Sequence, residues 1–196
     1  MPSPTLRSRM KKDERRVHIL NETMSIIGEQ GYHAFTLAML AKRCGLTNAG
    51  ILHYFGSKEG LLIALLKERD RQDEIAVASV LEPHLTHPPL SREACRASLH
   101  AIVERNVGQP AMVRLYAMLR AEALTPDHPA HRFFRNRESA TIEIFRQMVT
   151  GHVPDPLSTA RQIEAMMNGL EQQWLRQDCQ YDLLGEWDKA AAMILP

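Results

Sequence analysis

The stretch from Thr36 to Phe55 reads TLAMLAKRCGLTNAGILHYF. It holds two short segments of helical apolar spacing, residues 37–44 and 48–55, on either side of Gly45. Ala41 is a small residue where two crossing helices would come close, and Gly45 can adopt the positive φ of a tight turn. Three apolar anchors would hold the second helix on the first: Leu40, Leu46 and Ile51. The spacing predicts a helix-turn-helix, with an ordinary pair of antiparallel helices as the alternative.

Helical signals continue on both sides of this stretch. Before it, apolar residues recur at three and four positions, and Gly31 is placed to end that helix: Val17, Leu20, Met24 and Ile27. Thr36, Thr47 and Ser57 are N-cap residues for the second, third and fourth helices. The fourth helix is long, loses its apolar pattern past Arg69 and is expected to end near Leu81.

The same residues resemble the tetracycline-repressor (TetR) family. Residues 46–58, LTNAGILHYFGSK, resemble the family's recognition helix, residues 30–36, QGYHAFT, its first-helix exit, and residues 58–62, KEGLL, the start of its fourth helix. The resemblance covers roughly residues 15–66, and residues 168–175 more weakly resemble a helix used for dimerisation. It implies a three-helix DNA-binding head, a linking fourth helix, and a helical body that binds a small molecule.

The resemblance also implies which residues contact DNA. The third helix would enter the major groove, where the Asn48 amide can pair bidentately with adenine, and Ala49 and Gly50 offer shape and methyl contacts. Five polar or basic residues suit phosphate oxygens: Thr36, Thr47, His53, Tyr54 and Lys58. Arg7 and Arg9 belong to a basic arm over the backbone or in the minor groove. For His53 and Tyr54 the alternative is packing in the core, where we also expect Phe55.

Two departures from the family pattern bear on this prediction. Leu52 stands where many members carry a tyrosine that touches DNA, and Ala38 and Met39 supply no polar group from the second helix. Few side chains therefore remain to contact bases directly. We expect greater reliance on DNA shape and on the N-terminal arm.

The remainder of the chain is also predicted to be helical. After a proline-rich loop at residues 82–89 we expect five more helices, so the fold class is all-α with about nine helices, and no segment has the alternation of a strand. The predicted divisions are a basic arm at 1–14, a helix-turn-helix domain at 15–57, and a linker helix with a ligand-binding and dimerisation domain at 58–196.

Apolar side chains on the body helices are candidates for a ligand pocket. Methionine suits adaptable apolar cavities, which favours a small apolar effector, although each residue could instead fill the core. The candidates are Met112, Tyr116, Phe134, Phe145, Met148, Met166 and Met167. His100, Arg114, Glu122 and Asn168 are weaker candidates for orienting a ligand.

The last two helices carry the predicted dimer contacts. Their apolar stripes suit a four-helix bundle across a two-fold axis, and two heads one helical turn apart would read a palindrome. The residues are Ile163, Leu170, Trp174, Leu184, Trp187, Ala191 and Ile194.

Charge and composition bound the function. Residues 1–56 hold eight of the 24 Lys and Arg but only four of the 23 Asp and Glu. This excess of positive charge indicates nucleic-acid contact at the N-terminal end, with a solvated basic tail as the alternative. Three separated cysteines favour a reducing cytoplasm. No metal, cofactor or catalytic motif is recognised, so an enzyme is disfavoured.

We expect a homodimeric repressor released from operator DNA by an apolar effector. A small-molecule carrier and a regulator without an effector are the alternatives.

Overall fold

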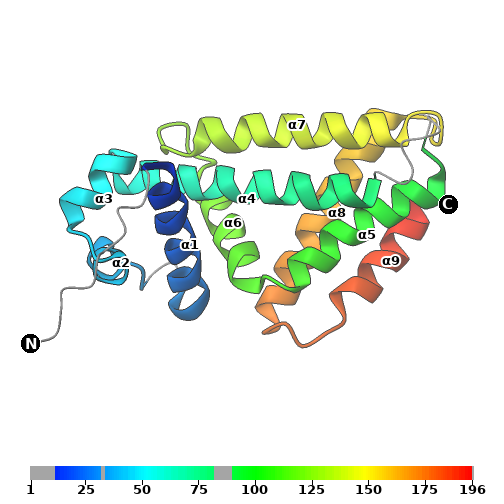
Figure 1. Cartoon of the computed structure of the whole chain (residues 1–196). Coiled ribbons are helices and arrows are strands. Elements are labelled where there is room, and N and C mark those ends of the chain that lie inside the picture. Colours follow the sequence, from blue (N-terminus) through cyan, green and yellow to red (C-terminus); the bar gives the residue numbers. More distant parts are fainter. Residues whose placement is uncertain (1–11, 32–33, 82–89, 196) are drawn as a thin grey trace, which may run out of the picture. The chain divides into compact units, whose positions relative to one another are not determined.

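The computed structural model describes residues 12–31, 34–81 and 90–195, and every regular element within these ranges is an α-helix. The helices are α1 (Lys12–Gln30), α2 (Leu37–Cys44), α3 (Asn48–Phe55), α4 (Lys58–Leu81), α5 (Arg92–Val107), α6 (Pro110–Glu122), α7 (His131–Val149), α8 (Pro156–Arg176) and α9 (Leu183–Ile194) (Figure 1). The all-α prediction is therefore confirmed. None of the helices in these ranges is long and apolar enough to cross a membrane.

The described residues divide into two compact units between Leu65 and Leu66, inside α4. We call the first unit the head and the second the body. In the head α1 packs on α2, and α2 packs on α3. In the body α8 packs on α6, α7 and α9, while α5 packs on α6, α7 and α9.

The head is held together by one buried set of apolar side chains. Those with 0–1% exposure come from all four helices and from Phe35 in the α1–α2 connection: Ile19, Leu20, Ile26, Ile27, Phe35, Leu40, Ile51, Leu61 and Leu65. Val17 is a correction to the sequence analysis, because its side chain is 46% exposed. The buried face of α1 runs through Ile19 and Thr23 instead, and the Thr23 hydroxyl donates back to the Ile19 carbonyl at 2.7 Å.

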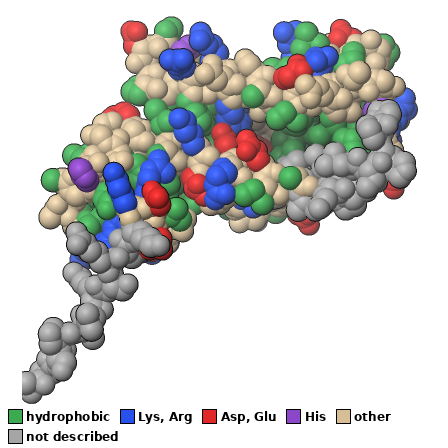
Figure 2. Space-filling model, turned by 45° about the horizontal axis from the view of Figure 1, so that its top comes forward, with side chains coloured by type: hydrophobic (Ala, Val, Ile, Leu, Met, Phe, Trp, Pro, Cys, Tyr) green, Lys and Arg blue, Asp and Glu red, His purple; other side chains and the backbone are tan. Residues whose placement is uncertain are grey.

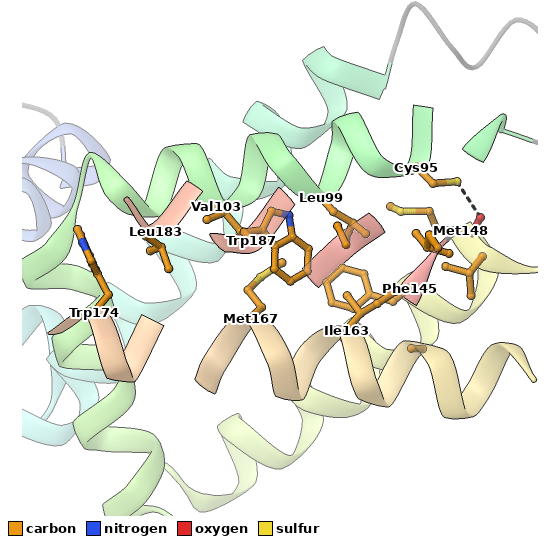
Figure 3. Close-up of a cluster of buried hydrophobic side chains, with 14 residues drawn as sticks. Cys95, Leu99, Val103, Phe145, Met148, Ile163, Met167, Trp174, Leu183 and Trp187 are labelled. Atoms are coloured by element: carbon orange, nitrogen blue, oxygen red, sulfur yellow. Dashed lines mark hydrogen bonds between the residues drawn. The ribbon is translucent and has the colours of Figure 1, made fainter. Parts of the chain in front are cut away.

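The body has a larger core, formed by α5, α7, α8 and α9. Trp187 of α9 is fully buried there between Leu99 of α5 and Met167 of α8 (Figure 3). At one end of this cluster the Cys95 thiol donates to the Met148 carbonyl at 3.1 Å, which gives the buried sulfur a partner. This cluster packs α8 and α9 against α5 and α7 within one chain.

Candidate nucleic-acid interface and effector site

The turn between α2 and α3 is built on Gly45. Gly45 has φ 64° and ψ 36°, the left-handed conformation that glycine adopts without a steric penalty. The following amide, Leu46 N–H, donates to the Ala41 carbonyl at 2.8 Å and closes the turn. The chain can then reverse within three residues, and α3 begins at Asn48.

Two threonines cap the helices of this motif, as predicted. The Thr36 Oγ1 accepts from Met39 N–H at 3.2 Å, and the Thr47 Oγ1 accepts from Gly50 N–H at 3.0 Å. Both hydroxyl groups are on exposed residues, and each keeps its own hydrogen for another acceptor. Both threonines can therefore cap a helix and donate to a phosphate oxygen.

The α3 helix has one exposed side and one buried anchor. Ile51 is fully buried, whereas Thr47, Asn48, Ala49 and His53 are exposed. Gly50 and Tyr54 are half-buried, and the His53 and Tyr54 rings meet edge to face with centroids 5.9 Å apart. Of the predicted contacts, Asn48, Ala49 and His53 thus lie on the solvent side of one short helix, with Thr47 exposed at its N-cap.

Lys58 and Phe55 lie at the junction of α3 with α4. The Lys58 ammonium is 5.7 Å from the centroid of the buried Phe35 ring, a cation–π distance. Phe55, expected in the core, is only half-buried, and the Arg16 guanidinium lies 5.3 Å from its ring centroid. Arg7 and Arg9, assigned to the arm, lie outside the described residues.

Arg43 joins α2 to α1, although the sequence analysis counted it only as a positive charge. Its guanidinium on α2 reaches three α1 side chains: Glu29 at 2.8 and 2.9 Å, Glu22 at 2.8 Å and Ser25 at 3.0 Å. Hydrogen bonds from Arg43 lower the pKa of Glu29 to about 2. Figure 2 shows acidic side chains among the basic ones on the visible face of the helices near the N-terminus. The charge of Arg43 is therefore matched within the head.

The predicted ligand residues divide into two groups in the body. Phe145, Met148 and Met167 belong to the core cluster of Figure 3. Tyr116 and Phe134 lie apart from that cluster and meet edge to face with centroids 5.9 Å apart. Met112 is buried on α6, and Met166 is 41% exposed on α8.

A charged network that the sequence analysis missed surrounds Tyr116. The Tyr116 hydroxyl donates to Asp70 Oδ1 at 2.8 Å, and the same carboxylate pairs with Arg137 at 2.8 Å. The Arg69 and Arg137 guanidinium groups lie 4.6 and 5.0 Å from the Tyr116 ring centroid. Burial, with the Asp70 charge, raises the pKa of Tyr116, so this phenol stays a neutral donor.

The four weaker candidates for orienting a ligand lie in different places. His100 pairs with Asp188 at 2.8 Å between α5 and α9, and Arg114 and Glu122 are exposed. Asn168 is half-buried and hydrogen-bonds the Glu164 carboxyl on α8. Only Asn168 is therefore joined to a buried charged group.

The described residues hold no cluster of three His, Cys, Asp or Glu side chains suited to a metal ion.

Most of the predicted dimer residues are occupied within one protomer. Ile163, Trp174, Trp187 and Ala191 are 0–4% exposed and belong to the core cluster. Leu170, Leu184 and Ile194 are half-buried and pack against that cluster. The first four have almost no surface left for a second copy to cover.

Over the described residues the geometry is that of an all-helical protein with a capped helix-turn-helix in its head, and the comparisons match that head to a known family. Residues 19–65 match the family model described as bacterial regulatory proteins, tetR family. The match covers the helix-turn-helix head, which is similar to the DNA-binding domain of the TetR family.

The relatives and solved structures match different parts of the chain. The HTH-type transcriptional regulator BetI of Cronobacter sakazakii is 38% identical over 92 residues, which are 47% of this chain and 43% of that protein. The match thus spans less than half of the relative's length. The same fold is found in a transcriptional regulator from Rhodococcus sp. Rha1, with a TM-score of 0.77 and 17% sequence identity. The alignment covers 94% of this chain and 96% of that one. It is also found in the fatty acid degradation regulator FadR from Bacillus halodurans, with a TM-score of 0.75 and 17% identity over 95% of this chain and 97% of that one.

Proposed function

We propose that this chain is a DNA-binding transcriptional regulator, a repressor that binds a palindromic operator as a homodimer. The observation that carries the proposal is α3, a capped helix that is anchored by Ile51 and presents Asn48 at its exposed N-terminal end. A helix held in this way can enter a major groove with its first turn at the base edges. Because its target would be operator DNA, we place the protein in the cytoplasm.

Each predicted contact residue is given a specific role in this proposal. Asn48 would read one base, while Thr36, Thr47, His53, Tyr54 and Lys58 would contact phosphates. The hydroxyl groups of the two capping threonines suit this role because they are donors on exposed residues. Ala49 and Gly50 would let the helix approach the groove closely. Arg7 and Arg9 of the arm would add phosphate or minor-groove contacts.

Dimerisation is proposed through the outward face of α8. Ala165, Met166, Gly169 and Gln173 recur at three and four positions; three are exposed and Gly169 is half-buried. A Cβ added at Gly169 would meet nothing within 4 Å, so the surface beside it is open. The half-buried Leu184 and Ile194 of α9 would add apolar area. Small residues on a helix allow a symmetry-related helix to approach closely.

An effector bound in the body would release the repressor from DNA. Its apolar part would pack near Met112, Tyr116 and Phe134, where the aromatic pair adjoins the charged network. The regulatory role does not require catalysis, and we propose no enzymatic activity. A small-molecule carrier is less favoured because ligand carriage would not require a helix-turn-helix with an exposed α3.

The experiment is fluorescence anisotropy of the purified protein on tiled DNA from upstream of its own gene, at two salt concentrations. We expect tight binding to one palindromic tile, with affinity that falls steeply as salt rises because phosphate contacts release counterions. The slope of log affinity against log salt concentration, here called the salt slope, gives the number of phosphate contacts. Weak binding to every tile, with no palindrome preferred, would contradict a role at a local operator and favour the carrier.

A further inference from the structure

Arg16 of α1 lies over the last residue of α3. Its guanidinium carbon is 5.3 Å from the centroid of the Phe55 ring, which is within the range of a cation–π contact. Phe55 was expected in the core but is only half-buried, so this contact lies at the surface of the head. Arg16 therefore joins α1 directly to the C-terminal end of α3.

The positive charge of Arg16 is not matched within the described part of the head. Arg43 of α2 pairs with Glu22 and Glu29, whereas Arg16 forms no ion pair with any residue that the structure describes. Arg16 is also exposed. An arginine that stacks on an aromatic face keeps the N–H groups around its edge for acceptors. Arg16 thus has a charge and hydrogen-bond donors available to a partner outside the chain.

The contact lies beside residues that are proposed to contact phosphates. Phe55 follows Tyr54, and the centroids of their rings are 6.3 Å apart. The Tyr54 ring in turn meets the His53 ring at 5.9 Å. Phosphates follow one another every ~3.4 Å of the helix axis along each strand of a duplex. A backbone that passes Tyr54 would therefore bring further phosphates toward Arg16.

Both helices that hold this contact are fixed at that point. The end of α3 is closed by Gly56 N–H, which donates to the Leu52 carbonyl at 2.7 Å. In α1, Ile19 follows Arg16 by three residues and is fully buried, which anchors this turn of the helix. A guanidinium that is already held on a ring loses less conformational freedom when it binds an anion. The arrangement is thus preorganised for a ligand with oxygen acceptors.

We infer that Arg16 is a further phosphate contact of the head: Phe55 orients the guanidinium, and the guanidinium edge donates to an oxygen of the DNA backbone. The inference rests on the proposed function in taking the anion to be DNA. It extends the DNA-binding surface to α1, through a helical residue that follows the N-terminal arm. A phosphate carries no sequence information, so Arg16 adds affinity and leaves base preference to Asn48.

The test measures the affinity of the full-length protein for its palindromic tile and for a duplex without a palindrome, by fluorescence anisotropy over a series of salt concentrations. We expect Arg16→Gln to weaken binding to both duplexes at least about tenfold and to lower the salt slope by about one for each bound head. Arg16→Lys keeps the charge but not the planar fork, so it should restore the slope and only part of the affinity.

Phe55→Leu tests the role of the ring, because it keeps Arg16 and an apolar side chain while removing the stacking surface. We expect weaker binding with an unchanged salt slope. Arg16→Gln should then cost less affinity in the Phe55→Leu background than in the wild type, since the two residues act together. Strictly additive losses would show that the ring does not orient the guanidinium.

Arg176→Gln is the matched control. It removes the same charge from an exposed residue in the last turn of α8, outside the head, and should change neither affinity nor slope. Melting temperatures close to that of the wild type are expected for Arg16→Gln and Arg16→Lys, because the side chain is exposed. If Arg16→Gln weakens binding but keeps the wild-type salt slope, Arg16 only supports α3 and the phosphate contact is ruled out.

The second duplex separates this inference from the proposed function. Equal binding to both duplexes, with a salt slope that still falls in Arg16→Gln, would remove the palindromic operator and keep the phosphate contact. A preference for the palindrome with an unchanged slope in Arg16→Gln would do the reverse. A protein that binds neither duplex would overturn both.

Discussion

At the scale of single residues, Gly60 links the end of α3 to the start of α4. A Cβ added at Gly60 would lie 2.1 Å from the Phe55 carbonyl oxygen, and backbone atoms cannot move away as a flexible side chain can. Gly60 N–H also donates to the Ser57 Oγ cap at 3.0 Å, which fixes its place in the first turn. We predict that Gly60→Ala lowers the free energy of unfolding by about 1–3 kcal/mol, measured by urea denaturation.

Gly28 is the matched control for that substitution. It lies in α1, and a Cβ there would meet nothing within 4 Å. Because alanine has the higher helix propensity, Gly28→Ala should raise the free energy of unfolding by up to about 1 kcal/mol. Equal effects of the two substitutions would show that the close approach at Phe55 has no energetic importance.

Asn48 is the single residue on which base reading is predicted to depend. Its side chain is exposed in the first turn of α3, where Ala49 and Gly50 offer no hydrogen bond. We expect Asn48→Ala to lose about 1–3 kcal/mol of discrimination at one base position and to keep the salt slope of binding, because no phosphate contact is removed. Competition binding with operators substituted one base pair at a time measures both. An unchanged base preference would rule out Asn48 as the reader.

At the scale of elements, Arg43 joins α2 to α1, and its pairing makes the head sensitive to acid. The pKa of Glu29 is about 2 in the folded head against an ordinary 4.5. A carboxyl whose pKa is lowered by folding stabilises the fold above its unfolded pKa, and that stabilisation is lost as pH falls from about 4.5 toward 2. We predict that Arg43→Gln lowers the melting temperature at pH 7, and that the difference from wild type shrinks by pH 3.

The same variant distinguishes a positioning role from a phosphate contact. If Arg43 only holds α2 on α1, the substitution weakens operator binding and leaves the salt slope of affinity unchanged. A slope lower by about one unit would instead assign Arg43 to a phosphate. Replacing the exposed Lys42, which precedes Arg43 in α2, gives the salt slope against which that of Arg43→Gln is compared.

The helices were predictable because their signals are local. Thr36, Thr47 and Ser57 cap helices through a backbone N–H three residues ahead, and Gly45 takes the positive φ that its position in the turn requires. Val17 shows where local spacing fails, since the three-and-four pattern fits more than one face of α1. The face that is buried depends on how α2 packs, which no stretch of α1 encodes.

At the scale of the whole molecule, the helix-turn-helix of the head was predictable, but the polar interior of the body was not. The hydrogen bonds that define this interior join residues far apart in sequence: Arg69 and Asn106 are 37 positions apart, Asp70 and Arg137 are 67, and Asn106 and Glu171 are 65. An isolated arginine or glutamate on a helix resembles a solvated surface residue. Only the folded arrangement shows that Arg69 and Glu171 are buried and that Asp70 pairs with Arg137.

In the proposed dimer, the outward face of α8 links the oligomeric state to DNA binding. We predict that Gly169→Glu converts the dimer to a monomer in light scattering, because two symmetry-related carboxylates would be brought together across a close helix contact. Operator affinity should fall by on the order of 100-fold, since each head would then bind its half-site alone. Ala121→Glu adds the same charge at an exposed position of α6 and should change neither property. A dimer that survives Gly169→Glu would place the interface elsewhere on the body.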